Sequence, residues 1–196
     1  MGGLISILTS DLYPDRVSSL VLISPAAPAF SLRTLNIPAA ARLSVPLIPW
    51  IGGKVIDAFR DHYTVDEGVV EALTFVAVNP DTLDPDVWER AAEIAALRRT
   101  QPWATGALVE ATNSILPHVL RKGRFGELIH RVTQPTLLIH GTDDELIHVA
   151  AARWIGRQRP DWTVVFFEGV GHVPMLEAPD RLLAVFATWE TAMIPA

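Results

Sequence analysis

LLIHGTDDE, residues 137–145, is the stretch that decides the fold of this chain. The apolar run Thr136–His140 ends at a glycine and predicts a strand buried on both faces, which is typical of a parallel sheet. Asp143 and Asp144 follow on the loop at the strand's carboxyl end, the edge at which ligands bind in open parallel sheets. Either carboxylate can also cap a helix or a turn, so this stretch alone leaves their role open.

A second loop, EGVGHVPMLEAP at residues 168–179, follows the predicted strand Thr163–Phe167 and carries His172. Because parallel strands end at the same edge of a sheet, we expect His172 to lie beside the acidic loop. A carboxylate that accepts a hydrogen bond from one imidazole nitrogen fixes the tautomer that leaves the other nitrogen free to take a proton. The two loops therefore predict an acid–base pair suited to nucleophilic catalysis.

The remaining pattern predicts an α/β fold. Strands that alternate with helices imply parallel pairing with right-handed crossovers. Between Ala26 and Val132, short amphipathic segments interrupted by proline and glycine predict a separate layer of helices. The other expected elements are a helix over residues 1–12, a doubly buried strand Val17–Ser24, a helix Val149–Gly156 and a closing helix Pro179–Ala192.

Composition excludes several classes of function. The net charge of -6 and the scattered basic residues argue against a nucleic-acid partner. The absence of cysteine excludes disulfides, thiolate metal sites and a cysteine nucleophile. No apolar run is long enough to span a bilayer and no secretory leader is recognisable, so the expected location is the cytoplasm.

No metal or cofactor is expected. Five further histidines show no paired spacing with a nearby acid, which a metal site on one element would need. Two of them, His140 and His148, flank the acidic loop, where we expect structural or supporting roles. The others are His62, His118 and His130.

The two loops together resemble those of the α/β-hydrolase family. That family places its acid in a strand-Gly-x-x-Asp loop, which corresponds to Asp144 rather than Asp143, although similar sequences commonly carry proline where this chain has His148. Its base lies in a Gly-x-Gly-His-x-x-x-x-Glu-x-Pro segment, which matches Gly169 to Pro179 and points to His172. The resemblance implies a partial α/β-hydrolase fold with a large helical cap insertion, whose parallel strands are the last three of the family's sheet. It implies a helix and strand of the hydrolase core at 1–25, the cap at 26–132 and the core with acid and base at 133–196.

The family's nucleophile elbow reads Gly-x-Ser-x-Gly, and this chain begins Met1-Gly2-Gly3. By the resemblance, Met1 follows the nucleophile and its backbone nitrogen is the expected oxyanion donor, while the nucleophilic serine is expected to be missing. Other serines fit poorly, because Ser6, Ser10 and Ser24 lack glycines on both sides. Pro25, after Ser24, also has no N–H for an oxyanion hole.

The resemblance implies hydrolysis of carboxylic esters, with a small apolar acyl or ester substrate, by a Ser-His-Asp mechanism in the full-length form. These 196 residues alone are expected to be inactive. Other chemistries of the family stay open, among them those of haloperoxidases, epoxide hydrolases and carbon–carbon hydrolases. A non-catalytic interaction module or half of a split enzyme is the alternative from another class.

Two features bear on what such a chain binds. The strand Val17–Ser24 lacks a neighbour on one side, and the exposed sheet edge predicts self-association. Aromatic residues of the cap either line an apolar acyl pocket or pack the cap helices against one another. These residues are Trp50, Phe59, Phe75, Trp88 and Trp103.

Overall fold

The chain folds around a small parallel sheet. The computed structural model describes residues 1–28, 45–48 and 50–193. Its strands are β1 (Leu20–Ile23), β2 (Thr136–Gly141) and β3 (Thr163–Phe167), and their order in the sheet is β1-β2-β3. Both pairings are parallel, so the expected α/β fold with three parallel strands is confirmed.

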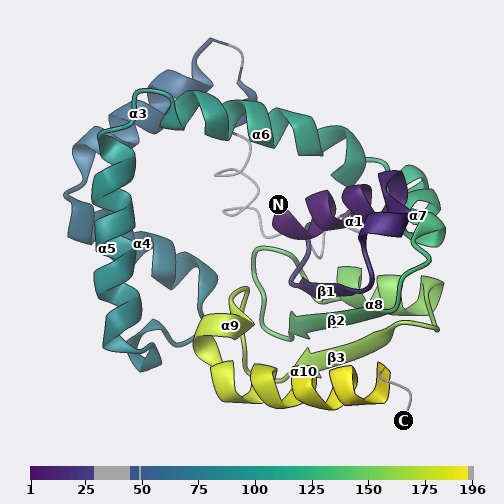
Figure 1. The fold of residues 1–196 in the computed structure, drawn as a ribbon. Coiled ribbons are helices and arrows are strands. Elements are labelled where there is room, and N and C mark those ends of the chain that lie inside the picture. The colour runs from purple at the N-terminus through teal and green to yellow at the C-terminus, as the bar shows by residue number, and fades with distance from the viewer. Residues whose placement is uncertain (29–44, 49, 194–196) are drawn as a thin grey trace.

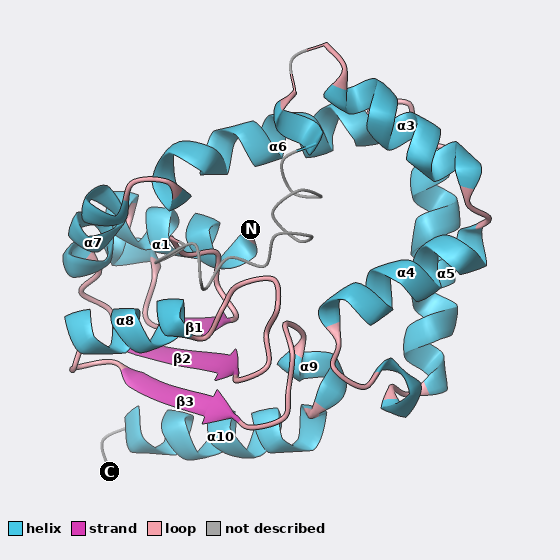
Figure 2. Cartoon of the chain, turned by 180° about the vertical axis from the view of Figure 1, so that it is seen from behind, coloured by secondary structure: helices cyan, strands magenta, loops and turns pink. Residues whose placement is uncertain are grey.

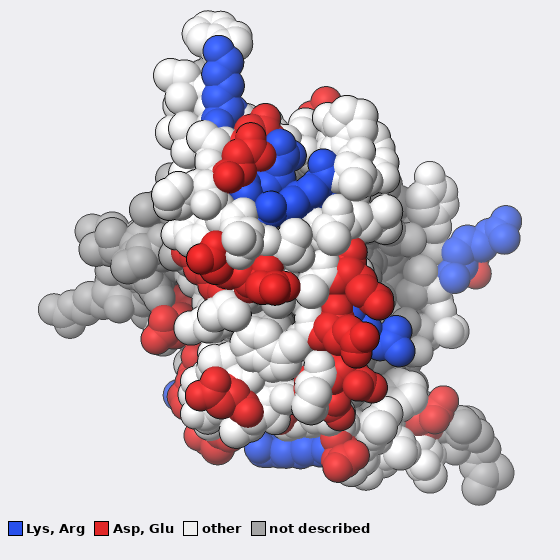
Figure 3. All heavy atoms as spheres, turned by 90° about the vertical axis from the view of Figure 1, so that its left-hand side faces the viewer, with Lys and Arg blue, Asp and Glu red and all other residues white. Residues whose placement is uncertain are grey.

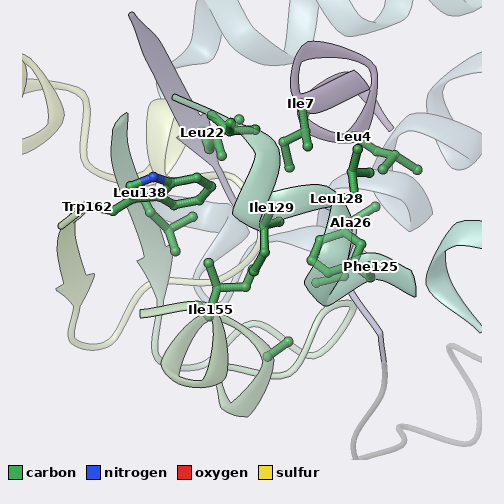
Figure 4. Close-up of a cluster of buried hydrophobic side chains, with 14 of the residues drawn as sticks. Leu4, Ile7, Leu22, Ala26, Phe125, Leu128, Ile129, Leu138, Ile155 and Trp162 are labelled. Atoms are coloured by element: carbon green, nitrogen blue, oxygen red, sulfur yellow. The ribbon is translucent and has the colours of Figure 1, made fainter. Parts of the chain in front are cut away.

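Helices cover both faces of this sheet (Figure 1). The first face packs against α1 (Gly2–Leu12), α7 (Lys122–Arg131) and α8 (Ala150–Gln158), and Figure 4 shows the apolar side chains that meet there. The second face packs against α10 (Pro179–Met193). Alternation along β2 explains this arrangement, because Leu138 belongs to the first cluster while Leu137 and Ile139 belong to the second.

A layer of helices arches away from the sheet (Figures 1 and 2). Within it, α4 (Val65–Val76) and α5 (Pro85–Arg99) enclose a third apolar cluster that includes Val69, Leu73 and Leu83. Acidic side chains are spread over the face of the molecule seen in Figure 3. The helices of the layer are α3 (Gly52–His62), α4 (Val65–Val76), α5 (Pro85–Arg99) and α6 (Ala104–Val119), and short 3₁₀ turns cover Pro14–Arg16, Val45–Leu47 and Pro80–Thr82.

The first strand is shorter than expected. Residues 14–16 form a 3₁₀ turn after α1, and pairing with β2 begins only at Leu20, whose N–H donates to the Pro135 carbonyl. Val21 and Ile23 are half-buried, so the expectation of burial on both faces is wrong for β1. The cause is its place at the edge of the described sheet, whereas the central strand β2 is buried throughout.

Other elements follow their predictions within a few residues, with two exceptions. Helix α7 falls in the range 26–132 expected for the cap, but Phe125 and Ile129 pack in the cluster with α1, β2 and α8. A short helix, α9 (Pro174–Glu177), also follows the base loop. The expected boundaries 1–25, 26–132 and 133–196 therefore stay a prediction, with α7 packed on the sheet.

None of the helices in the described ranges is long and apolar enough to cross a membrane.

Candidate active site

The loops that follow β2 and β3 are joined by backbone hydrogen bonds. The N–H of Thr142 donates to the Phe167 carbonyl at 2.9 Å, and the N–H of Asp143 donates to the Val170 carbonyl at 3.0 Å. A side chain at position 141 would overlap the carbonyl groups of Val170 and Gly171, which explains the glycine that ends β2. The two loops are thus held against each other at the carboxyl edge of the sheet, as the sequence predicts.

Asp144 and His172 meet at this edge. Oδ2 of Asp144 lies 2.8 Å from Nδ1 of His172, while Oδ1 accepts hydrogen bonds from the backbone N–H groups of Leu146 and Ile147. The Asp144 side chain is fully buried, whereas the neighbouring Asp143 is exposed. The carboxylate that contacts the imidazole is therefore the one to which the family resemblance points.

A second imidazole contacts the same carboxylate. Nε2 of His140 lies 2.8 Å from the Ile147 carbonyl and 3.3 Å from Oδ2 of Asp144. Both partners are acceptors, so Nε2 carries the proton. Burial lowers the pKa of His140, and the opposing attraction of Asp144 is smaller. His140 is therefore neutral and donates to the Ile147 carbonyl, with the Asp144 carboxylate beside the same N–H. The i, i+4 spacing alone does not reveal this contact, because His140 lies in β2 and Asp144 on the loop after it.

The other ring nitrogen of His172 is available for proton transfer. The His172 side chain is 22% exposed, and its hydrogen bond to Asp144 uses Nδ1. In the parts of the chain that the structure describes, no hydroxyl group hydrogen-bonds to Nε2. The arrangement can thus accept a proton at Nε2 and hold the resulting imidazolium against the buried carboxylate.

The start of α1 lies near the same edge. A Cβ atom on Gly3 would lie 2.7 Å from Cβ of Pro25, just beyond β1, so only glycine allows the helix to approach so closely. Met1 precedes this contact and is partly exposed, and partial burial lowers the pKa of its amino group. Its expected role as an oxyanion donor stays a prediction.

The other serines named from the sequence have different surroundings. Ser6 donates to the Gly2 carbonyl and Ser10 donates to Gln134 at 2.8 Å. Ser24 follows β1 with a φ of 41°, a left-handed conformation that is uncommon outside glycine, and its Oγ is buried without a hydrogen-bond partner in the described structure. Nothing in the local sequence pattern indicated this backbone conformation.

The remaining histidines are exposed or half-buried. His148 is exposed, and its Nδ1 accepts from the backbone of Ala150 at the start of α8. His62 and His130 are exposed and His118 is half-buried. Over residues 1–28, 45–48 and 50–193, no group of three or more histidine, aspartate or glutamate side chains is arranged to hold a metal ion.

Three of the five cap aromatics fill one of the two expected roles. Phe59 and Phe75 line an apolar cavity of about 260 Å³ between α3 and α4. Trp88 packs in the α4–α5 cluster, whereas Trp50 and Trp103 are mostly exposed. The sequence alone could not tell the cavity-lining, packed and exposed side chains apart, because all of them lie in segments with a similar mixture of apolar and polar residues.

Sequence comparison decides the family. A family model described as alpha/beta hydrolase fold matches residues 1–179. The chain belongs to the α/β-hydrolase family. A pimeloyl-[acyl-carrier protein] methyl ester esterase from Aromatoleum aromaticum is 30% identical over 186 residues, covering 92% of this chain and 67% of the relative. The protein of that name from Nitrosomonas europaea is 27% identical over 190 residues, covering 95% and 67%.

Solved structures show the same fold at lower identity. A putative lipase from Acinetobacter baumannii matches with a TM-score of 0.65 and 21% identity, covering 97% of this chain and 59% of the lipase. A 2-hydroxy-6-oxo-6-phenylhexa-2,4-dienoate hydrolase from a Rhodococcus strain matches with a TM-score of 0.65 and 16% identity, covering 97% and 61%. The chain therefore spans about three-fifths of these structures and two-thirds of the two esterases.

Proposed function

We propose that this chain supplies the acid and the base of a carboxylic-ester hydrolase, with Asp144 as acid and His172 as base. The hydrogen bond of 2.8 Å between Oδ2 of Asp144 and Nδ1 of His172 carries the proposal. Family membership and the names of the esterase relatives support it.

In the proposed reaction a serine hydroxyl attacks the ester carbonyl. Nε2 of His172 takes the hydroxyl proton and later delivers it to the leaving alcohol. Asp144 accepts from Nδ1–H throughout, which keeps Nε2 unprotonated before attack and stabilises the imidazolium afterwards. The backbone nitrogen of Met1 is the proposed oxyanion donor, and water then hydrolyses the acyl-serine.

The nucleophilic serine of this proposal lies outside the described residues. No described hydroxyl contacts Nε2 of His172, and Ser6 and Ser10 are engaged elsewhere. The Ser24 hydroxyl is buried, and Pro25 after it offers no N–H to an oxyanion. By the resemblance the nucleophile corresponds to the position before Met1, and we therefore expect residues 1–196 by themselves to lack ester turnover.

The proposed substrates are esters with an apolar acyl part, and methyl esters come first because two relatives are named methyl ester esterases. The cavity beside Phe59 and Phe75 supports an apolar chain, since its lining is mostly aliphatic and aromatic. We also propose that the 196-residue chain associates with itself through the outer edge of β1.

The test compares two proteins on p-nitrophenyl butyrate and on methyl esters of medium-length acids. One is the gene product that contains these residues, purified from its native source, and the other is residues 1–196 alone. We expect hydrolysis by the gene product and its loss in His172→Ala, by about a millionfold where triad residues act as a unit. The exposed His130→Ala is the matched control. Hydrolysis that survives His172→Ala would refute the assignment of the base.

A further inference from the structure

The loop that carries His172 is bound to the end of cap helix α4 as well as to the sheet. The backbone N–H of His172 donates to the Val76 carbonyl, the last residue of α4, at 2.8 Å. This contact ties the backbone of the candidate base directly to the helical layer.

Glu177 joins the same two segments through its side chain. Oε1 accepts from the backbone N–H of Gly171 at 2.9 Å, and Oε2 accepts from the backbone N–H of Val78 at 2.8 Å. Gly171 precedes His172, and Val78 lies two residues beyond α4. One carboxylate thus holds the base loop with one oxygen and the cap with the other, through hydrogen bonds that its charge strengthens.

The spacing of this contact depends on Gly171. A Cβ atom at that position would lie 2.8 Å from the Val76 carbonyl oxygen and 3.0 Å from Oε1 of Glu177. A side chain would therefore push the base loop away from both partners. The glycine is the counterpart of the glutamate, because it allows the close approach that the glutamate then holds.

Apolar packing joins the same segments. Val173, just before α9, and Leu176, within it, pack against the cluster of Val69, Leu73 and Ala77 in and just after α4. Figure 1 shows α9 beside the end of α4. The residues around His172 thus pack with residues of the cap, whereas Asp144 lies on the loop that follows β2.

We propose that Glu177 is a positioning residue that couples the cap to the catalytic base, by holding the end of α4 and the His172 loop at a fixed separation. That the coupled residue is a catalytic base rests on the proposed function. A shift of α4 moves His172 relative to Asp144, because the N–H of His172 is bonded to α4 whereas the Asp144 carboxylate is held by the N–H groups of its own loop. Occupation of the cap by substrate therefore bears directly on the Asp144–His172 hydrogen bond.

The experiment measures amide hydrogen exchange and the imidazole N–H proton by NMR in the 196-residue chain. In Glu177→Gln the amide oxygen still accepts one N–H, but its NH₂ group faces the other. We expect protection at Gly171 and Val78 to fall about tenfold or more. We also expect the N–H resonance shared by His172 and Asp144 to broaden or shift. Protection at Leu146 and Ile147, whose N–H groups bind Asp144, should stay the same.

Glu168→Gln is the matched control, because Glu168 is an exposed glutamate in the same loop and its substitution should change none of these signals. Glu177→Asp keeps the charge but shortens the side chain, and serves if Glu177→Gln does not fold. It should release the same amides, because the shorter carboxylate cannot reach both.

Three results would overturn the proposal. The first is unchanged protection at Gly171 and Val78, and the second is a uniform loss of protection that includes Leu146 and Ile147. The third is a loss of protection at Gly171 and Val78 with an unchanged His172 resonance. None of these readouts requires ester turnover. If the expected changes in exchange and in the His172 resonance are seen while the native gene product fails to hydrolyse esters, the positioning role of Glu177 stands and only the proposed function fails.

Discussion

Nε2 of His140 lies 3.3 Å from Oδ2 of Asp144, the same oxygen that contacts Nδ1 of His172. The acid candidate therefore faces an imidazole on each side, one fully buried and one partly exposed. Because burial lowers the pKa of His140 and favours its neutral form, it lies against the carboxylate without adding a second positive charge. This arrangement sets the pH dependence and the mutational behaviour expected of the site.

The stability of the chain should fall on mild acidification because of His140. Its pKa is lowered in the folded state, so the unfolded state binds the proton first and stability rises with pH. The contribution is complete above the unfolded pKa of about 6.5 and is lost as pH falls toward the folded value, at up to about 1.4 kcal/mol per pH unit. Asp144, His172 and His148 are the charged or titratable groups that act on it.

Urea unfolding between about pH 7 and about pH 5.5 tests this dependence. His140→Gln keeps an N–H donor but does not titrate, and should flatten the slope in this range. His62→Gln, at an exposed position, should leave it unchanged. Equal slopes for the original chain and His140→Gln would show that another group is responsible.

Asp144→Asn should keep the fold but reverse the tautomer of His172. The carboxamide oxygen can still accept from Leu146 and Ile147, while its NH₂ group faces Nδ1 of His172 and the N–H of His140. The clash of donors should cost about 1–3 kcal/mol of folding stability. Nitrogen-15 NMR of the imidazole should show the proton on Nε2 in the variant and on Nδ1 in the original chain.

Asp143→Asn is the control for that substitution, because Asp143 is exposed and its side chain does not contact His172. It should leave both the tautomer and the unfolding midpoint unchanged. In the native gene product Asp144→Asn should lower kcat by about 10⁴-fold, as the wrong tautomer does in a related triad. A variant with normal kcat would remove Asp144 from the proposed mechanism.

Gly141→Ala should be strongly destabilising, because the added methyl group overlaps the carbonyls of Val170 and Gly171. We expect a loss of about 2–4 kcal/mol in chemical unfolding, since backbone must move to make room. Gly106→Ala is the comparison, because a Cβ there meets nothing within 4 Å and the helical position favours alanine. Similar stability for the two variants would contradict the close approach of the loops.

The 196-residue chain should self-associate through β1. Leu20 and Ser24 donate their N–H groups to the β2 side, so by alternation Val21 and Ile23 direct theirs outward. Val21→Pro removes one outward donor and should shift the protein toward monomer in sedimentation velocity across a concentration series. A chain that is monomeric at every concentration before substitution would make this prediction wrong.

The sequence was sufficient for the elements with a strong local pattern. The continuous apolar run of β2 and the bounds of β3 were predicted almost to the residue, since a run of this kind has few local alternatives. It was less successful at β1, because the burial of Val21 and Ile23 depends on which strands lie beside them. The packing of α7 on the sheet was missed for the same reason.

By itself the sequence determined the order of strands and helices, the two glycine-containing loops at one sheet edge, and Asp144 and His172 as the acid–base candidates. The order of elements and the shared edge follow from local periodicity and from the rule that parallel strands end together, whereas the choice of Asp144 over Asp143 rests on the resemblance to the α/β-hydrolase family. Only the tertiary structure decided that His140 lies against Asp144, that Ser24 has a left-handed backbone, and that Glu177 joins the base loop to Val78, 99 residues away. Such contacts depend on the packing of distant segments, which local pattern does not encode.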